Sequence, residues 1–122
     1  MKFYKCGECL SVAMEIVPGK HEGQKTFDEL KANTTDAAGE KHVPVVSKQN
    51  DRIQVKVGEL EHPMQEEHYI MWIYLETEQG GYLRILSPGD RPEAEFLLNA
   101  GDQPVAAYEY CNLHGLWKKE IR

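Results

Sequence analysis

Alternating apolar and polar residues dominate the second half of the chain. Residues 52–58 (RIQVKVG) carry an apolar side chain at every second position, which predicts a half-buried β-strand. Residues 69–75 (YIMWIYL) are continuously apolar and rich in aromatic and branched side chains, which favours a strand buried on both faces over so short a helix. Further short strands, set apart by turn residues, are expected at residues 82–86, 95–98 and 105–110.

Short antiparallel strands at this spacing predict an all-β fold, either a β-sandwich or a barrel. Gln79-Gly80-Gly81 stands between two of the strands and predicts a β-hairpin. Only residues 27–38 (FDELKANTTDAA) have weak helical propensity, and the sequence has no internal repeat.

The first 35 residues differ from the rest of the chain. They contain a CxxC segment, Cys6-Gly7-Glu8-Cys9, a turn signal at Pro18-Gly19, and a polar stretch that offers no core face. We therefore expect a compact N-terminal module or arm over residues 1–35 and a main domain over residues 36–122.

Length and charge narrow the class of protein. A chain of 122 residues fits one domain, or one domain with a small appendage. A net charge of −6 argues against nucleic acid or an anionic membrane as a partner, and no apolar run approaches the roughly 20 residues that span a bilayer. Three cysteines are an odd number, and no signal peptide is recognised, so a cytoplasmic location is expected.

Histidines stand out at the expected strand boundaries, where the loops of a sandwich gather and functional sites are usually built. Four of the five have this setting: His42, His62, His68 and His114. The fifth, His21, lies in the polar N-terminal stretch. Cys111 precedes His114 by three residues.

Four imidazoles and one thiol are a donor set for a metal ion. A structural zinc site usually takes four ligands, whereas five ligands leave an octahedral metal one open position and so favour a redox-active iron. A Cys111–His114 nucleophile pair is a weaker interpretation, because no oxyanion-binding signature accompanies it.

Three segments resemble the superoxide reductase family, which includes the desulfoferrodoxins and neelaredoxins. They are residues 34–46 (TTDAAGEKHVPVV), 61–77 (EHPMQEEHYIMWIYLET) and 106–121 (AAYEYCNLHGLWKKEI), in the family's order. The resemblance runs from about Phe27 to the C-terminus. It implies an immunoglobulin-like antiparallel β-sandwich that holds one mononuclear non-haem iron. By position in the motifs, the equatorial ligands are His42, His62, His68 and His114, the last through Nδ1, and the axial ligand is Cys111.

The resemblance also implies an activity, the one-electron reduction of superoxide to hydrogen peroxide by Fe(II) with an external electron donor such as rubredoxin. It assigns Glu40 to the sixth position of ferric iron and Lys41 to the attraction of superoxide. We expect the backbone N–H groups of Leu113 and His114 to face the Cys111 sulfur, and Trp117 and Lys118 to frame the site. Family members form dimers and tetramers, so a homo-oligomer is expected. The alternatives are an iron electron-transfer or metal-binding module without turnover on the same fold, and a structural zinc domain.

The N-terminus departs from the family pattern. Many desulfoferrodoxins bind a second iron there through a CxxC and a later pair of adjacent cysteines. This chain keeps Cys6 and Cys9, but residues 20–26 read KHEGQKT, so a four-sulfur site cannot form within one chain and the second iron is predicted to be absent. The segment is then a structural remnant. Alternatively, Cys6 and Cys9 form a disulfide or redox pair, or bind a metal with His21 or with a partner subunit's cysteines.

Overall fold

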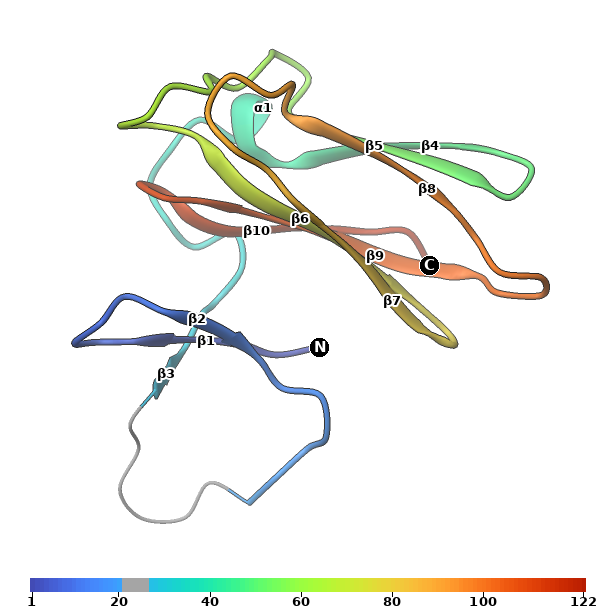
Figure 1. The fold of residues 1–122 in the computed structure, drawn as a ribbon, viewed down its shortest axis with the longest axis horizontal. Coiled ribbons are helices and arrows are strands. Elements are labelled where there is room, and N and C mark those ends of the chain that lie inside the picture. The colour runs from blue at the N-terminus through green and yellow to red at the C-terminus, as the bar shows by residue number, and fades with distance from the viewer. Residues whose placement is uncertain (21–26) are drawn as a thin grey trace. The chain divides into compact units, whose positions relative to one another are not determined.

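Antiparallel β-strands make up almost all the regular structure of the chain (Figure 1). The computed structural model describes residues 1–20 and 27–122, and these residues form two units, Met1–Lys31 and Ala32–Arg122. The first unit is a small sheet in the order β2-β1-β3. Its strands are β1 (Phe3–Cys6), β2 (Val12–Met14) and β3 (Phe27–Glu29).

The second unit is a sandwich of two antiparallel sheets, ordered β10-β9-β6-β7 and β4-β5-β8 (Figure 1). This three-plus-four arrangement confirms the predicted immunoglobulin-like sandwich. Its elements are α1 (Gly39–His42), β4 (Pro44–Gln49), β5 (Arg52–Val57), β6 (Ile70–Thr77), β7 (Gly80–Ile85), β8 (Glu93–Leu97), β9 (Pro104–Cys111) and β10 (Gly115–Glu120).

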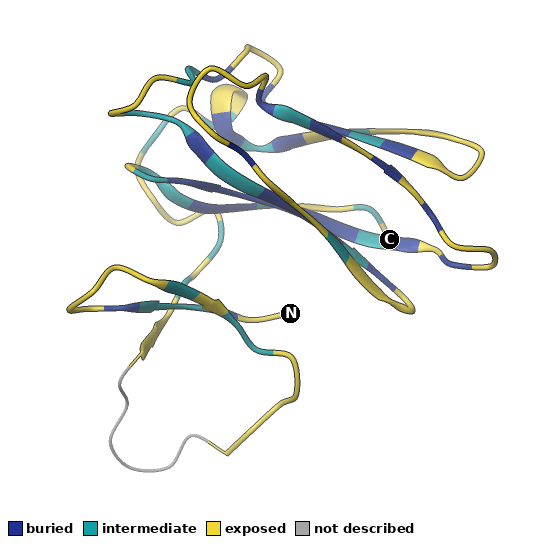
Figure 2. Cartoon of the chain, viewed as in Figure 1, coloured by how far each residue is buried: buried dark blue, intermediate teal, exposed yellow. Residues whose placement is uncertain are grey.

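The core lies between the two sheets and follows the apolar pattern of the sequence (Figure 2). In β5, Ile53, Val55 and Val57 are buried. Arg52, which precedes Ile53, and Lys56, which lies between Val55 and Val57, are exposed. The predicted period-two strand is therefore confirmed. Its buried side chains contribute about 2 kcal/mol each by leaving water.

β6 lies at the centre of the four-stranded sheet, between β9 and β7, as its continuous apolar sequence predicts. Its pairing with β9 shifts by one residue between Ile70 and Trp72. Such a bulge turns the inward face of a strand, which explains why Ile70 and Ile73, three positions apart, are both fully buried. The shift falls at the end of β6 where Ile70 pairs with Cys111.

Two sequence predictions need correction. Residues 27–38 do not form a helix: Phe27–Glu29 is strand β3, and the one helix in the described part of the chain is α1. Tertiary pairing overrides weak propensity here, since β3 pairs with β1. Strand β10 was not expected, although it pairs with β9 along its whole length, from Gly115↔Cys111 to Glu120↔Ala106.

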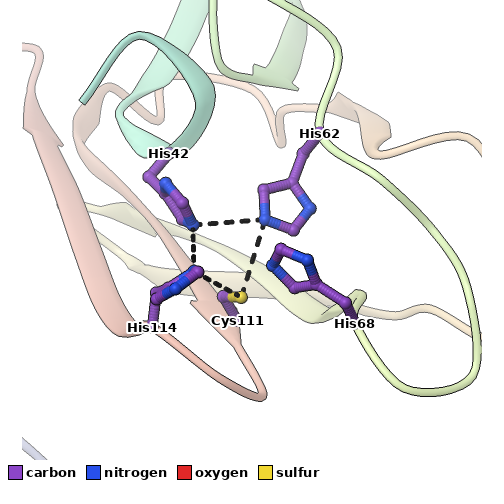
Figure 3. Close-up of side chains that lie close together, drawn as sticks. All are labelled: His42, His62, His68, Cys111 and His114. Carbon is purple, nitrogen blue, oxygen red and sulfur yellow. Dashed lines mark hydrogen bonds between the residues drawn. The ribbon is translucent and has the colours of Figure 1, made fainter. Parts of the chain in front are cut away.

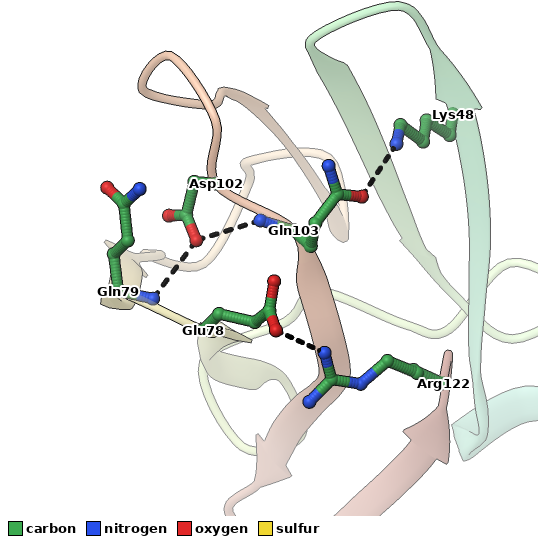
Figure 4. Close-up of polar contacts among 6 residues, drawn as sticks. All are labelled: Lys48, Glu78, Gln79, Asp102, Gln103 and Arg122. Carbon is green, nitrogen blue, oxygen red and sulfur yellow. Dashed lines mark hydrogen bonds and ion pairs between the residues drawn. The ribbon is translucent and has the colours of Figure 1, made fainter.

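Asp102 ties together two turns at one end of the sandwich (Figure 4). Its carboxylate accepts hydrogen bonds from the backbone N–H groups of Gln79, at 3.0 Å, and Gln103, at 2.9 Å. Nearby, Arg122 pairs with Glu78 at 2.6 Å, and Lys48 donates to the Gln103 side chain at 3.4 Å. Burial raises the pKa of Asp102, but the hydrogen bonds outweigh burial and leave that pKa below its ordinary value.

The lowered pKa of Asp102 gives a pH-dependent contribution to stability. A carboxyl with a lower pKa in the folded than in the unfolded state stabilises the fold above the unfolded-state pKa, and this stabilisation is lost as pH falls through the folded-state pKa. Asp102→Asn should therefore lower the free energy of unfolding near neutral pH, and the deficit should shrink in acid. Urea unfolding across that range measures it. A deficit that does not change with pH would contradict the charge-based account.

Candidate metal centre

Five side chains converge at the other end of the sandwich (Figure 3). His42 ends α1, His62 and His68 lie between β5 and β6, Cys111 ends β9, and His114 lies between β9 and β10. One ligand atom from each lies within 4.8 Å of all the others. The structure thus brings together all five residues that the sequence proposes as ligands of the mononuclear iron.

The four imidazoles follow one another around a closed ring. Neighbouring ring centroids are 4.7 Å apart for His42 and His62, 4.6 Å for His62 and His68, 5.1 Å for His68 and His114, and 4.8 Å for His114 and His42. Nε2 of His42 lies 3.2 Å from Nε2 of His62 and 3.1 Å from Nδ1 of His114. A metal about 2.1 Å from two nitrogens at right angles would hold them about 3.0 Å apart, so these spacings fit a shared ion.

The thiol approaches the same ring. Sγ of Cys111 lies 3.6 Å from Nε2 of His62 and 3.9 Å from Nδ1 of His114. His114 therefore turns Nδ1 toward the cluster, whereas His42 and His62 turn Nε2. This pattern is the one that the family resemblance implies for His114.

In His42 and His62, the imidazole nitrogen that points away from the cluster is hydrogen-bonded to a backbone carbonyl, and this contact shows which nitrogen carries the lone pair. Nδ1 of His42 lies 2.8 Å from the Ala38 carbonyl, and Nδ1 of His62 lies 2.7 Å from the Pro63 carbonyl. A carbonyl only accepts, so each Nδ1 carries the proton and each neutral ring presents an Nε2 lone pair to the centre. Two facing lone pairs cannot form a hydrogen bond with each other, and a cation between them resolves the contact.

His68 supports the same conclusion. Its Nε2 is buried and has no hydrogen-bond partner among the described residues. A buried polar atom without a partner costs about 1–3 kcal/mol, which a metal bond would offset. The donor set of four imidazoles and one thiol therefore fits a single iron, in agreement with the prediction.

The cluster favours neutral imidazoles. Burial lowers the pKa of His62 to about 4, although its hydrogen bond to Pro63 opposes the change, and burial also lowers the pKa of His42 and His68. A neutral imidazole is the form that binds a metal, so these sites need no deprotonation near neutral pH.

Cys111 differs because its ligand form is charged. Burial raises the pKa of its thiol, and hydrogen bonds from the backbone N–H groups of His114 and Leu113 partly oppose that rise. These are the N–H groups that we expected at the sulfur. A bound cation is needed to hold this buried thiolate, and metal binding then releases its proton.

The β9–β10 turn holds two of the ligands. Cys111 pairs with Gly115 across the hairpin, and Gly115 has φ +78°, a conformation that glycine adopts without strain. Trp117 follows on β10, where its Nε1 donates to the His114 carbonyl at 3.1 Å and its ring stacks on His42 at 4.9 Å. Trp117 therefore frames the centre as expected.

Lys118 is placed differently. It pairs with Tyr108, and its Nζ lies 5.4 Å from the Tyr108 ring and 2.6 Å from a Glu120 oxygen. Successive residues of a strand face opposite sides of the sheet, so Lys118 lies on the side away from Trp117. The expectation that Lys118 frames the site is wrong.

Asn112 links the β9–β10 turn to the segment that carries His62 and His68. Its side-chain oxygen accepts from the Tyr69 N–H at 3.0 Å, and its amide donates to the Glu67 carbonyl at 3.1 Å. Within the segment, the backbones of Gln65 and His68 exchange two hydrogen bonds of 3.0 Å. Asn112 thus positions His68, a role that sequence reasoning did not assign.

Gly58 brings the backbone close to α1. A Cβ at this position would lie 2.6 Å from both the carbonyl carbon and the carbonyl oxygen of Lys41, and its φ of +81° disfavours other residues. The N–H groups of Gly58 and Leu60 donate to the carbonyls of Val43 and Glu40. This contact positions the short helix that carries His42.

Glu40 and Lys41 occupy exposed positions on α1, immediately before His42. The positive charge of Lys41 is one of the smaller causes, after burial, that lower the pKa of His42 and His68. Lys41 therefore acts on the electrostatics of the ring. The proposed roles of both residues remain predictions.

Glu109 is the residue near the centre that sequence reasoning missed. It lies on β9 two positions before Cys111, is fully buried, and neither carboxyl oxygen has a hydrogen-bond partner in the described part of the chain. Burial raises its pKa well above the ordinary value, which favours the neutral form of the acid. Its position was readable from the sequence, because period-two alternation in AAYEYC places Glu109 on the face of Cys111.

The N-terminal cysteines lie in the other unit. Cys6 is buried, Cys9 is exposed, and both are free thiols. His21, proposed as a possible metal ligand with them, lies outside the described residues. No helix in the described part of the chain is long and apolar enough to cross a membrane.

An all-β sandwich with a partly buried centre of four histidines and one cysteine defines a class of mononuclear metalloprotein. The sequence model of the family named Desulfoferrodoxin matches residues 34–120. The chain belongs to the desulfoferrodoxin family.

Three similar proteins illustrate the relationship. A desulfoferrodoxin of Syntrophotalea carbinolica is 48% identical, over 98% of this chain and 96% of its own. The crystal structure of the superoxide reductase from Treponema pallidum has 38% identity and a TM-score of 0.78, over 96% of this chain and 98% of its own. A superoxide reductase of Giardia intestinalis, designated 1Fe-SOR, has 31% identity and a TM-score of 0.57, over 68% of this chain and 98% of its own.

Gly58→Ala should weaken the metal centre without touching a ligand. The added methyl must displace the Lys41 backbone and adopt a strained φ, so we expect a loss of about 1–3 kcal/mol in the free energy of unfolding and weaker iron retention. Chelator competition and urea unfolding measure the two effects. Gly89→Ala is the matched control, because Gly89 also has a positive φ but its added Cβ meets no atom within 4 Å. Equal iron retention in both variants would contradict a role for Gly58 in positioning α1.

Proposed function

We propose that this protein is a superoxide reductase, which converts superoxide and two protons to hydrogen peroxide with one electron from an external donor. The convergence of four imidazoles and one thiol on a single point is the observation that carries this proposal. These residues would hold Fe(II), which would supply the electron when bound. The names of the Treponema pallidum and Giardia intestinalis relatives support the same activity.

The ligand residues hold the iron and set its electron density. His42, His62 and His68 are already neutral near pH 7, and Cys111 contributes the negative charge that favours electron release. Backbone N–H groups of Leu113 and His114 withdraw part of the sulfur's charge and thus adjust this effect. Burial raises the pKa of Glu109 well above its ordinary value, which favours a neutral acid over a second anion on the face of Cys111.

Lys41 and Glu40 have complementary proposed roles. The protein is acidic overall, so superoxide needs a local positive charge for attraction, and Lys41 stands exposed immediately before the ligand His42. Glu40, its exposed neighbour, supplies a carboxylate at the same edge of the site, where it would help the product to leave.

Residues 36–122 then form the catalytic domain, and residues 1–35 carry no second iron, because two cysteines cannot supply a four-sulfur site. Electrons must therefore come from another small redox protein, for which rubredoxin is the model. A homo-oligomer, dimeric or tetrameric, is the expected assembly. Three free thiols support a reducing cytoplasm as the location.

The proposal is tested by oxidising the iron-loaded protein and recording its visible spectrum. A thiolate-to-ferric charge-transfer band is expected, and Cys111→Ser should abolish it, while the matched variant Cys9→Ser should keep it. Reduced protein should yield one hydrogen peroxide for each superoxide consumed, with no dioxygen. A colourless protein that carries only zinc would refute the proposal, and a normal band without peroxide formation would favour a non-catalytic iron module.

Lys41→Ala should slow the reaction with superoxide by about tenfold at low ionic strength, because one steering charge is lost. The rate should also depend less on salt, since screening acts on that charge. Stopped-flow or pulse-radiolysis kinetics at several ionic strengths measure both effects. Lys48→Ala is the control: it removes the same charge at the far end of β4, where Lys48 contacts Gln103. Similar rates for both variants would remove Lys41 from the proposed mechanism.

A further inference from the structure

Cys6 and Cys9 share one tight turn in the N-terminal unit. Cys6 is the last residue of β1, and Cys9 lies in the turn toward β2. The Leu10 N–H donates to the Cys6 carbonyl at 3.2 Å, and the Cys6 N–H donates to the Ser11 carbonyl at 2.8 Å. Leu10 has φ +63°, which closes the turn and keeps the two thiols on the same loop.

The two thiols have unlike surroundings. Cys6 is only 8% exposed, and its sulfur accepts a hydrogen bond from the Cys9 N–H at 3.4 Å. Cys9 is exposed, and its sulfur lies 3.3 Å from the Ser11 hydroxyl oxygen. One thiol is therefore accessible to a reactant, while its neighbour is shielded.

Hydrogen bonds also make Cys9 the more reactive thiol. The Cys6 side chain, followed by the Ser11 hydroxyl and the Ser11 N–H, lowers the pKa of Cys9 to about 7. About half of Cys9 is then thiolate, the nucleophilic form, near neutral pH. Cys111 has the opposite character, since it is fully buried and its pKa is raised.

We propose that Cys6 and Cys9 form a thiol–disulfide exchange couple that takes a low-molecular-weight disulfide as its oxidant. The Cys9 thiolate attacks one sulfur of the substrate, breaks its S–S bond, and releases one half as a thiolate. Cys6 then loses its proton and attacks the Cys9 sulfur, which releases the second half as a thiolate and leaves a Cys6–Cys9 disulfide. The protein loses two electrons, which reduce the substrate disulfide to two thiols.

This activity is separate from the iron chemistry. It uses neither the metal ligands nor the product of the proposed reduction, and its residues all lie in Met1–Lys31. The competing use of two thiols is a metal site, but a four-thiolate site would need two further sulfurs from a second chain. The exposed, partly ionised Cys9 beside a shielded Cys6 favours exchange.

The test treats the reduced, iron-loaded, full-length protein with one equivalent of the aromatic disulfide DTNB in the absence of oxygen. The wild-type protein should release both aromatic thiolates, and dithiothreitol should restore the free thiols. Trypsin cleavage after Lys5 and Lys20 isolates residues 6–20, which contain both cysteines and exclude Cys111. That peptide should carry an internal disulfide and no adduct.

Two variants assign the roles. Cys6→Ser should release one aromatic thiolate and retain an adduct on Cys9. Cys9→Ser should react with DTNB at least about tenfold more slowly than the wild type. Iron content and visible spectrum, which report on the other unit, should match the wild type in both. The proposal is overturned if wild-type protein keeps the adduct on Cys9, or if Cys9→Ser reacts as fast as Cys6→Ser. It is also overturned if Cys6 and Cys9 do not react with DTNB and metal analysis finds a second metal ion in the protein.

Discussion

Repulsion among inward-facing lone pairs is the constraint on which the ligand end of the sandwich depends. Nδ1 of His42 and Nδ1 of His62 donate to backbone carbonyls, so their Nε2 atoms face each other at 3.2 Å as acceptors. His68 adds a buried nitrogen without a partner. A cation would turn each of these unfavourable features into a bond, so metal binding and the stability of this end of the protein are thermodynamically linked.

The surrounding backbone prepares the ring for that cation. Gly58 packs against the carbonyl of Lys41, Asn112 fastens the β9–β10 turn to the segment of His68, and Trp117 covers His42. Each contact fixes a ligand-bearing loop to the rigid sandwich, so little further ordering is needed when the metal binds. The ligands come from three separate stretches of the chain, and the paired strands β6, β9 and β10 bring His68, Cys111 and His114 to one end of one sheet.

Much of this architecture follows from local sequence pattern. The period-two run in β5 and the apolar run in β6 predict their strands, because these patterns report burial directly. The five ligands are recognised by residue type, by their position at strand boundaries and by the family motifs. β10 is harder to predict, because its sequence GLWKKE does not alternate clearly and its pairing partner, β9, defines it. The role of Gly58 cannot be predicted from the local sequence, because its close contact is with Lys41, a residue 17 positions earlier in the chain.

Glu109 is a buried carboxyl close in sequence to the ligand Cys111, and its protonation affects the stability of the Cys111 thiolate. Its carboxyl is fully buried without a hydrogen-bond partner among the described residues, and a negative charge on it is a smaller cause, after burial, that raises the pKa of Cys111 and so opposes thiolate formation. Burial favours its neutral form instead. Burying a neutral carboxyl without a partner costs about 1–3 kcal/mol, which the apolar core of the sandwich offsets. The acid therefore stays compatible with the thiolate that the metal requires.

The chain thus contains two kinds of cysteine with opposite electrostatic settings. Cys111 is buried and its thiol pKa is raised, so a cation would have to replace the proton to hold the thiolate, which suits transfer of single electrons through a metal. Cys9 is exposed, and its thiolate is stabilised by neighbouring hydrogen-bond donors, which suits nucleophilic attack and two-electron exchange. A four-sulfur site within one chain needs four cysteines, and the N-terminal unit has only Cys6 and Cys9, both free thiols. The feature that rules out a four-sulfur iron within one chain is therefore the same feature that makes thiol–disulfide chemistry available in the N-terminal unit.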